Sequence, residues 1–165
     1  MPPANQAAAN AALLEIEIEA ARRCELMPNA AETLGILRGA GLKMALLTRN
    51  APEAKAIAMA KYPCLRFDLA WSREMGPLKP EPDGVLRACA ALEIDPALTV
   101  CVGDYRYDLE AARAAGAISV WLGRPDRPDF SEMADFTIRD LAELPRLLGL
   151  NGDRPAPGEI RRSHS

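Results

Sequence analysis

The segment LTVCVGDYRYDLEAARAAGA, at positions 98–117, joins an apolar run to an acidic turn and then to a helical pattern. Residues 98–103 are expected to form a buried strand, and residues 107–115 a helix that Gly116 ends. A second apolar strand, ISVWL, follows at 118–122. Buried strands that alternate with helices are typical of a parallel sheet covered by helices on both faces, so the segment predicts an α/β fold.

The same alternation continues on both sides of this segment. Asn50 precedes one of the expected helices, and its side chain is expected to act as the N-cap. Residues 150–165 are polar, contain Pro and Gly, and are expected to be disordered. The remaining patterns predict helices at 8–26, 29–40, 51–61, 82–92 and 141–149, and strands at 43–48, 67–72 and 136–138.

Composition limits the function classes. The 165 residues suit one domain, 49% are apolar and 26% charged, and the net charge of −3 comes without a basic, aromatic-rich patch. Nucleic acid and membrane are therefore not expected as partners. The four cysteines lack C-x-x-C spacing, so we expect buried reduced thiols and a cytoplasmic location. The single histidine, His164, lies in the polar tail, so chemistry must use carboxylates, Lys, Thr or a metal.

Polar side chains follow the apolar runs at the points where parallel sheets bind ligands. Thr48 ends one strand, Asp104 follows another, and Lys79 lies in the loop between them. The Thr48 hydroxyl could hold a phosphate oxygen, and the Lys79 ammonium could neutralise the charge of a phosphoryl transition state. Asp104 offers an oxygen ligand for Mg²⁺, and Asp108 could reach the same ion.

Each of these residues also has an ordinary structural explanation. Thr48 could be a helix cap, Lys79 a solvated charge, and Asp104 with Asp108 two acids that face a helix dipole. Their order and their placement at strand ends together favour a site. The order Thr, Lys, Asp also differs from that of phospho-receiver domains, in which the aspartates come first.

On these residues the chain resembles the haloacid dehalogenase-like hydrolase superfamily, and within it the phosphoglycolate-phosphatase-like group. The resemblance covers about residues 14–149 and implies a three-layer, Rossmann-like parallel sheet. The strand-end segment at 102–117 is its most specific part. The other matching motifs are LLTRN at 46–50, LKPEPDGVL at 78–86 and FTIRDLAELPRLL at 136–148.

The resemblance implies a Mg²⁺-dependent phosphatase that acts on a small phosphorylated metabolite. It assigns catalytic roles to Thr48, Lys79 and Asp104, and metal binding to Asp104 with Asp108. Arg49 and Asn50 would border the substrate.

One family motif has no counterpart. In the family, the first strand ends in Asp-x-Asp, which supplies the nucleophile and the acid/base. This sequence contains no Asp-x-Asp, and its first aspartate is Asp68. Residues 1–26 resemble the remnant of a helical cap and residues 27–149 the α/β core. We therefore expect the chain to be truncated and inactive. It would lack most of the cap and the central strand, which in the family lies between the strand that ends at Thr48 and the strand that ends at Gly103.

Three hypotheses remain open from the sequence. The first is a family phosphatase whose sequence has lost its N-terminal part. The second is a non-catalytic module that binds phosphorylated ligands, acts in regulation, or completes its sheet with another chain. The third is a decaying gene product without function.

Overall fold

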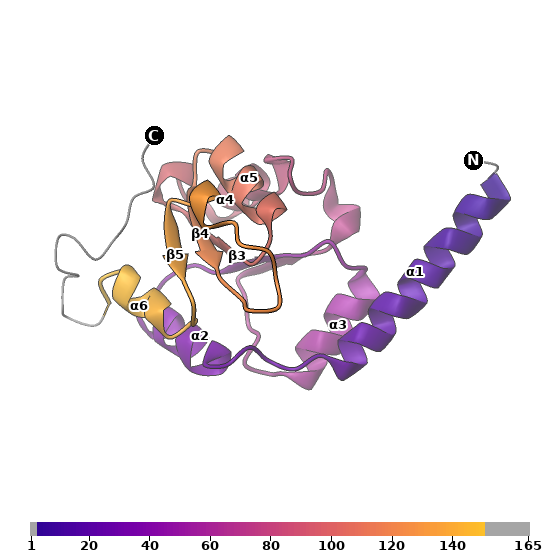
Figure 1. Cartoon of the computed structure of the whole chain (residues 1–165), viewed down its shortest axis with the longest axis horizontal. Coiled ribbons are helices and arrows are strands. Elements are labelled where there is room, and N and C mark those ends of the chain that lie inside the picture. Colours follow the sequence, from indigo (N-terminus) through magenta and orange to yellow (C-terminus); the bar gives the residue numbers. More distant parts are fainter. Residues whose placement is uncertain (1–2, 151–165) are drawn as a thin grey trace.

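The computed structural model describes residues 3–150, which form an α/β structure with one helix projecting from it (Figure 1). The elements lie within a few residues of the ranges expected from the sequence. The helices are α1 (Pro3–Arg23), α2 (Ala30–Gly39), α3 (Pro52–Lys61), α4 (Asp83–Leu92), α5 (Arg106–Ala114) and α6 (Glu143–Leu147). The strands are β1 (Ala45–Leu47), β2 (Leu69–Trp71), β3 (Val100–Gly103), β4 (Ile118–Leu122) and β5 (Phe136–Ile138), with 3₁₀ turns at Arg73–Met75, Pro96–Leu98 and Ser131–Met133.

The strands form two separate parallel sheets. β1 pairs with β2, with Leu46 opposite Ala70, and the second sheet has the order β3-β4-β5. Across residues 3–150, no strand pairs with the free edge of β1 or with that of β3. The parallel α/β fold class is confirmed, and the described part of the chain holds no strand between the strands that end near Thr48 and Gly103.

Helices cover both faces of the larger sheet because side chains alternate along β4. Val120 and Leu122 pack with Leu37 of α2 and Leu144 of α6. Trp121 points the opposite way and packs with Leu109 of α5. A further cluster joins α4 and α5 through Val85, Cys89, Ala111, Ala112, Ala115 and Ala117. β1 contributes Leu47 and β3 contributes Cys101 to this cluster, so α4 and α5 lie against both sheets.

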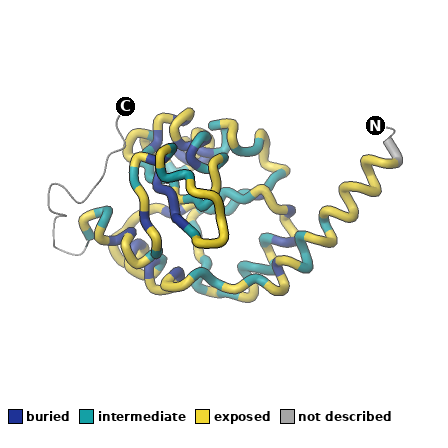
Figure 2. The backbone as a smooth tube through the Cα atoms, viewed as in Figure 1, coloured by how far each residue is buried: buried dark blue, intermediate teal, exposed yellow. Residues whose placement is uncertain are grey.

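The most buried strand is β4, whereas β3, for which the sequence predicted a buried strand, is only partly buried. Val120 and Trp121 have exposed fractions of 0% and 2%, whereas Val102 of β3 is 37% exposed. Figure 2 shows this buried strand at the centre of the body. The difference arises because β4 has strands on both sides, while β3 has one open edge. An apolar run in the sequence therefore indicates a fully buried strand only when other strands pair with it on both sides.

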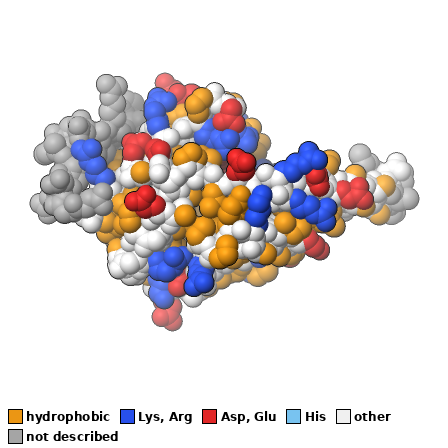
Figure 3. Space-filling model, turned by 90° about the horizontal axis from the view of Figure 1, so that it is seen from below, with side chains coloured by type: hydrophobic (Ala, Val, Ile, Leu, Met, Phe, Trp, Pro, Cys, Tyr) orange, Lys and Arg blue, Asp and Glu red, His pale blue; other side chains and the backbone are white. Residues whose placement is uncertain are grey.

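Helix α1 packs on α3 through its C-terminal half, while its N-terminal half extends away from the body (Figures 1 and 3). Lys61 of α3 donates hydrogen bonds to the carbonyl oxygens of Arg22 and Cys24, and the Tyr62 hydroxyl donates to Cys24 as well. Further along α1, Ile16 is 66% exposed. None of the helices in the described part is both long and apolar enough to cross a bilayer.

The expectation that residues 150–165 are disordered lies almost wholly outside the described residues, because only residue 150 of this range is described. Leu150 packs against the cluster that contains Leu37 and Leu144, and its amide donates to the Pro145 carbonyl oxygen at 2.9 Å.

Candidate active site

The site residues expected from the sequence lie at the ends of β1 and β3 and in the loop before α4. β1 ends at Leu47, so Thr48, Arg49 and Asn50 form the turn that leads to α3. β3 ends at Gly103, so Asp104 stands two residues before α5. The main-chain amide of Thr48 donates a hydrogen bond to the Trp71 carbonyl oxygen of β2 at 3.0 Å, which fixes the start of this turn against the β1–β2 sheet.

Lys79 connects the two sheets at these ends. Its Nζ lies 2.5 Å from Asp108 Oδ1 in α5 and donates to the Leu47 carbonyl oxygen at 3.0 Å. Both charged side chains are 20% exposed. The second Asp108 oxygen accepts a hydrogen bond from the Tyr105 amide at 3.3 Å. The interpretation of Lys79 as a solvated surface charge is therefore wrong, whereas Asp108 both pairs with Lys79 and caps its helix.

Gly103 makes room for this ion pair. A Cβ built on Gly103 would lie 2.2 Å from the Asp108 Cβ and 2.6 Å from its Oδ2. No real side chain fits at such distances, so only glycine at the end of β3 allows Asp108 to fold back toward Lys79.

The turn at the end of β1 is organised by the Thr48 hydroxyl, which accepts a hydrogen bond from the Asn50 amide at 3.1 Å. The prediction that Asn50 caps α3 is wrong, because the N-cap position is Ala51 and has no side-chain cap. The carboxylate of Glu17 in α1 takes over this role, since its Oε2 accepts from the Ala51 amide at 2.8 Å.

Glu17 also links the turn to Arg73, in the segment that follows β2. Its Oε1 lies 2.5 Å from Arg73 Nη1, with exposed side-chain fractions of 13% for Glu17 and 27% for Arg73. The Arg73 amide in turn donates to the Asn50 carbonyl oxygen at 3.1 Å. Sequence reasoning missed both residues, because a bond that joins positions 56 residues apart leaves no local pattern.

A small pocket of about 40 Å³ opens beside the turn, and Thr48, Arg49 and Lys79 all line it. Its volume equals that of a few water molecules, which suits a group the size of phosphate better than a whole metabolite. Asn50, Asp104 and Asp108 are not among the lining residues. Arg49 extends from the pocket toward the second sheet, where its guanidinium lies 5.2 Å from the centre of the Tyr107 ring.

The two aspartates are the metal donors that this edge offers. Among the described residues, no group of three or more His, Cys, Asp or Glu side chains is arranged to hold a metal ion. Mg²⁺, however, commonly uses one or two carboxylates and completes its shell with phosphate oxygens and water. Within residues 3–150 the Asp104 carboxylate makes no hydrogen bond, so it retains its capacity to bind a cation. Asp104 is therefore the carboxylate of this edge that could hold a Mg²⁺ ion completed by phosphate oxygens and water, whereas both Asp108 oxygens already have partners.

Burial raises the pKa of the Cys101 thiol in β3, with a further contribution from Cys89, to about 11 from an ordinary 9.0. All four cysteines are free, but Cys89 alone among them is fully buried, so the expectation of buried thiols holds in part. Since the folded pKa is raised, the neutral thiol contributes its full stability below about pH 9, and this contribution is lost as the pH rises through about 11.

We expect Cys101 to resist alkylation at pH 8, because a rise of two pKa units lowers the thiolate fraction about 100-fold. Iodoacetamide labelling followed by peptide mass spectrometry would measure this. In the folded protein Cys64 should react well before Cys101, and in 6 M urea the two should react alike. Equal rates in the folded protein would contradict the burial of Cys101.

Comparison with known proteins decides the family. The sequence profile of the haloacid dehalogenase-like hydrolases matches residues 4–116. This chain belongs to that family. Among curated relatives, it is 32% identical over 158 residues to a haloacid dehalogenase-like hydrolase domain-containing protein of Arabidopsis thaliana, covering 92% of this chain and 64% of that protein.

Other relatives of this haloacid dehalogenase-like chain place it in the phosphoglycolate-phosphatase-like group. It is 37% identical over 103 residues to phosphoglycolate phosphatase of Escherichia coli, covering 59% of this chain and 39% of that enzyme. A solved structure of a HAD phosphatase from Thermococcus onnurineus superposes with a TM-score of 0.72 at 29% identity, covering 82% of this chain and 64% of that one. The haloacid dehalogenase-like chain thus spans less than two thirds of the length of each of these relatives.

Proposed function

We propose that the site is that of a Mg²⁺-dependent phosphatase of the haloacid dehalogenase-like type, which takes a phosphate monoester of a small metabolite in a reducing, cytoplasmic compartment. The observation that carries this proposal is Lys79, which lies in one pocket with Thr48 and Arg49 and is held by Asp108. Relatives named phosphoglycolate phosphatase support a phosphorylated small-molecule substrate.

The residues divide the work by their chemistry. The Thr48 hydroxyl and the cations Arg49 and Lys79 bind the phosphate group in the pocket, and Asn50 borders the rest of the substrate. Asp108 holds the Lys79 ammonium in place so that its charge faces the phosphate oxygens. Asp104 and Asp108 would hold the Mg²⁺, which when bound supplies positive charge to those oxygens.

We further propose that the 165-residue chain binds phosphate esters without hydrolysing them. The chain has no Asp-x-Asp, and the Asp108 carboxylate is engaged by Lys79, which lines the pocket. This corresponds to a non-catalytic phospho-ligand module, the second candidate function. The two sheets, whose facing edges have no partner strand in the described part, favour it.

Turnover and binding measurements separate these candidates. With Mg²⁺, we expect the chain to hydrolyse p-nitrophenyl phosphate no faster than its Lys79→Ala variant. Calorimetry should show Mg²⁺-dependent binding of inorganic phosphate by the wild type, weakened at least about tenfold by Arg49→Gln, since one charged hydrogen bond contributes about 1.5–3 kcal/mol. Lys79-dependent hydrolysis would contradict inactivity, and a folded sample without phosphate binding would contradict the site itself.

A further inference from the structure

Two arginines flank the one carboxylate of the site that makes no hydrogen bond within residues 3–150. Arg124 Nη1 lies 3.7 Å from Asp104 Oδ2, and Arg127 Nε lies 4.0 Å from the same oxygen. Both distances exceed hydrogen-bond range, so the guanidinium groups act on Asp104 through their charge. The Asp104 side chain is 35% exposed and open to an ion from solvent.

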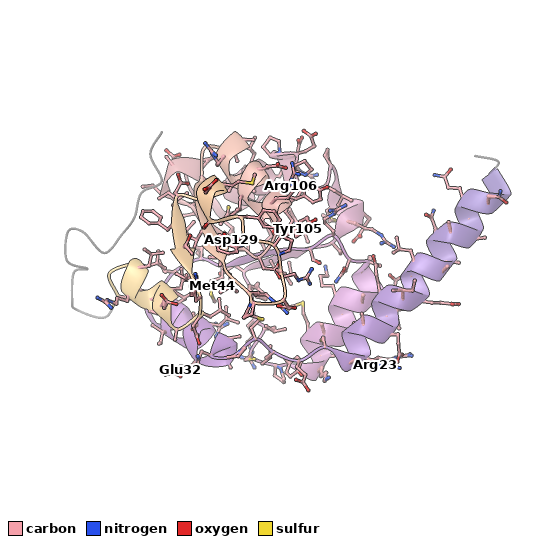
Figure 4. All side chains as sticks on the ribbon, in the orientation of Figure 1. Arg23, Glu32, Met44, Tyr105, Arg106 and Asp129 are labelled. Atoms are coloured by element: carbon pink, nitrogen blue, oxygen red, sulfur yellow. The ribbon has the colours of Figure 1, made fainter. Side chains whose placement is uncertain are left out.

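The loop after β4 holds these arginines in place through its own contacts. Arg124 forms a two-pronged pair with Asp126, at 3.0 Å and 2.8 Å, and the hydrogen bond from Arg124 lowers the pKa of Asp126. The loop is further fixed at its far end, where the Phe130 ring meets that of Tyr105 at a centroid distance of 5.2 Å. Figure 4 shows Tyr105 and Asp129 on the same side of the molecule.

The electrostatic consequence concerns any cation that approaches Asp104. The Asp104 carboxylate carries one negative charge, and two positive charges lie within about 4 Å of it. Because Asp126 pairs with Arg124, the four side chains together are neutral, and the two arginines cancel the attraction that Asp104 alone would offer a cation. A divalent cation at Asp104 would meet both guanidinium groups at distances where repulsion between charges is strong even near the surface. A phosphate dianion bound next to Asp104 would make the net charge around this carboxylate negative.

We propose that Arg124 and Arg127 suppress divalent-cation binding at Asp104 and make it depend on the arrival of the phosphate group. This inference rests on the proposed function for the identity of the metal ligand. It adds that two residues that contact neither phosphate nor metal set the order of binding. The cation and the phosphorylated ligand then enter together, and the protein holds little metal in the absence of ligand.

Binding of Mn²⁺, followed by the electron paramagnetic resonance signal of the free ion, tests this directly. We expect Arg127→Gln and Arg124→Gln each to tighten Mn²⁺ binding about 3–10-fold without phosphate, and the double variant to tighten it further. Inorganic phosphate should tighten binding in the wild type and have a smaller effect in the double variant. Arg106→Gln is the matched control, because Arg106 pairs with Glu110 at the same end of α5 and should leave Mn²⁺ affinity within twofold.

The outcomes distinguish this inference from the proposed function. Arg127 is 47% exposed, so its variant should fold even if loss of the Arg124–Asp126 pair disturbs the loop. If Asp104→Asn abolishes Mn²⁺ binding but both arginine variants match the wild type, the inference is overturned and the metal assignment stands. If the double variant also fails to bind Mn²⁺, or if Asp104→Asn has no effect, both fail.

Discussion

The Gly103→Ala variant is expected to lose about 3–5 kcal/mol of unfolding free energy, because the new methyl group would overlap Asp108 and force it away from Lys79. The added Cβ would meet three atoms of the Asp108 side chain, at 2.2, 2.4 and 2.6 Å. Moving Asp108 separates a partly buried ion pair, so steric and electrostatic costs act together. Urea denaturation followed by circular dichroism measures the change.

Gly35→Ala provides the control for this experiment. Gly35 is a solvent-exposed residue in the middle of α2, and a Cβ built on it would contact no atom within 4 Å. Alanine should stabilise the protein by about 0.5–1 kcal/mol, because glycine is unfavourable inside a helix. A Gly103→Ala protein as stable as the wild type would show that Asp108 does not fold back against the end of β3.

The Lys79→Met variant is expected to lose about 2–4 kcal/mol of unfolding free energy, because it leaves the Asp108 carboxylate without its partner. It also removes the donor to the Leu47 carbonyl oxygen, which is a cost of its own. The methionine side chain retains similar length and packing, so the loss reports the charge and its hydrogen bonds. The double variant Lys79→Met/Asp108→Asn should recover part of the stability, since no unpaired charge then remains.

Arg106→Met provides the comparison for an exposed ion pair. Arg106 and Glu110 lie 2.8 Å apart, with exposed side-chain fractions of 49% and 28%. Its loss should change stability by at most about 0.5 kcal/mol. If Lys79→Met costs no more than this control, the interaction of Lys79 with both sheets is not structurally important.

The sequence allowed the order of the elements to be anticipated, because it follows from local patterns. Apolar runs of strand length and helical periodicity gave the order of elements. Polar residues at strand ends indicated Lys79 and Asp108 as candidates for one site, but not that the two would form an ion pair. Such information survives at low sequence identity because it depends on spacing and not on particular neighbours.

The errors share one physical cause, which is that contacts between distant segments leave no local pattern. Asn50 is a good N-cap by type, but the Glu17 carboxylate of another helix bonds to the amide at the start of α3. The β3 run is apolar throughout, yet its burial depends on a neighbouring strand. The positions of Arg124 and Arg127 beside Asp104 likewise follow from the path of a loop that the sequence does not specify.

The unpaired edges of β1 and β3 in the described part of the chain have a consequence for handling the purified protein. Each strand presents main-chain donors and acceptors that can pair with an extended segment from another molecule, so self-association becomes a competing fate at high concentration. Among the described residues, the flanking helices, Lys79 and the contact of Arg49 with Tyr107 join the two sheets there. Local unfolding should therefore begin between β1 and β3 and leave the densely packed β4 intact. The main-chain amides of this region should then be the least protected against hydrogen exchange in the native state.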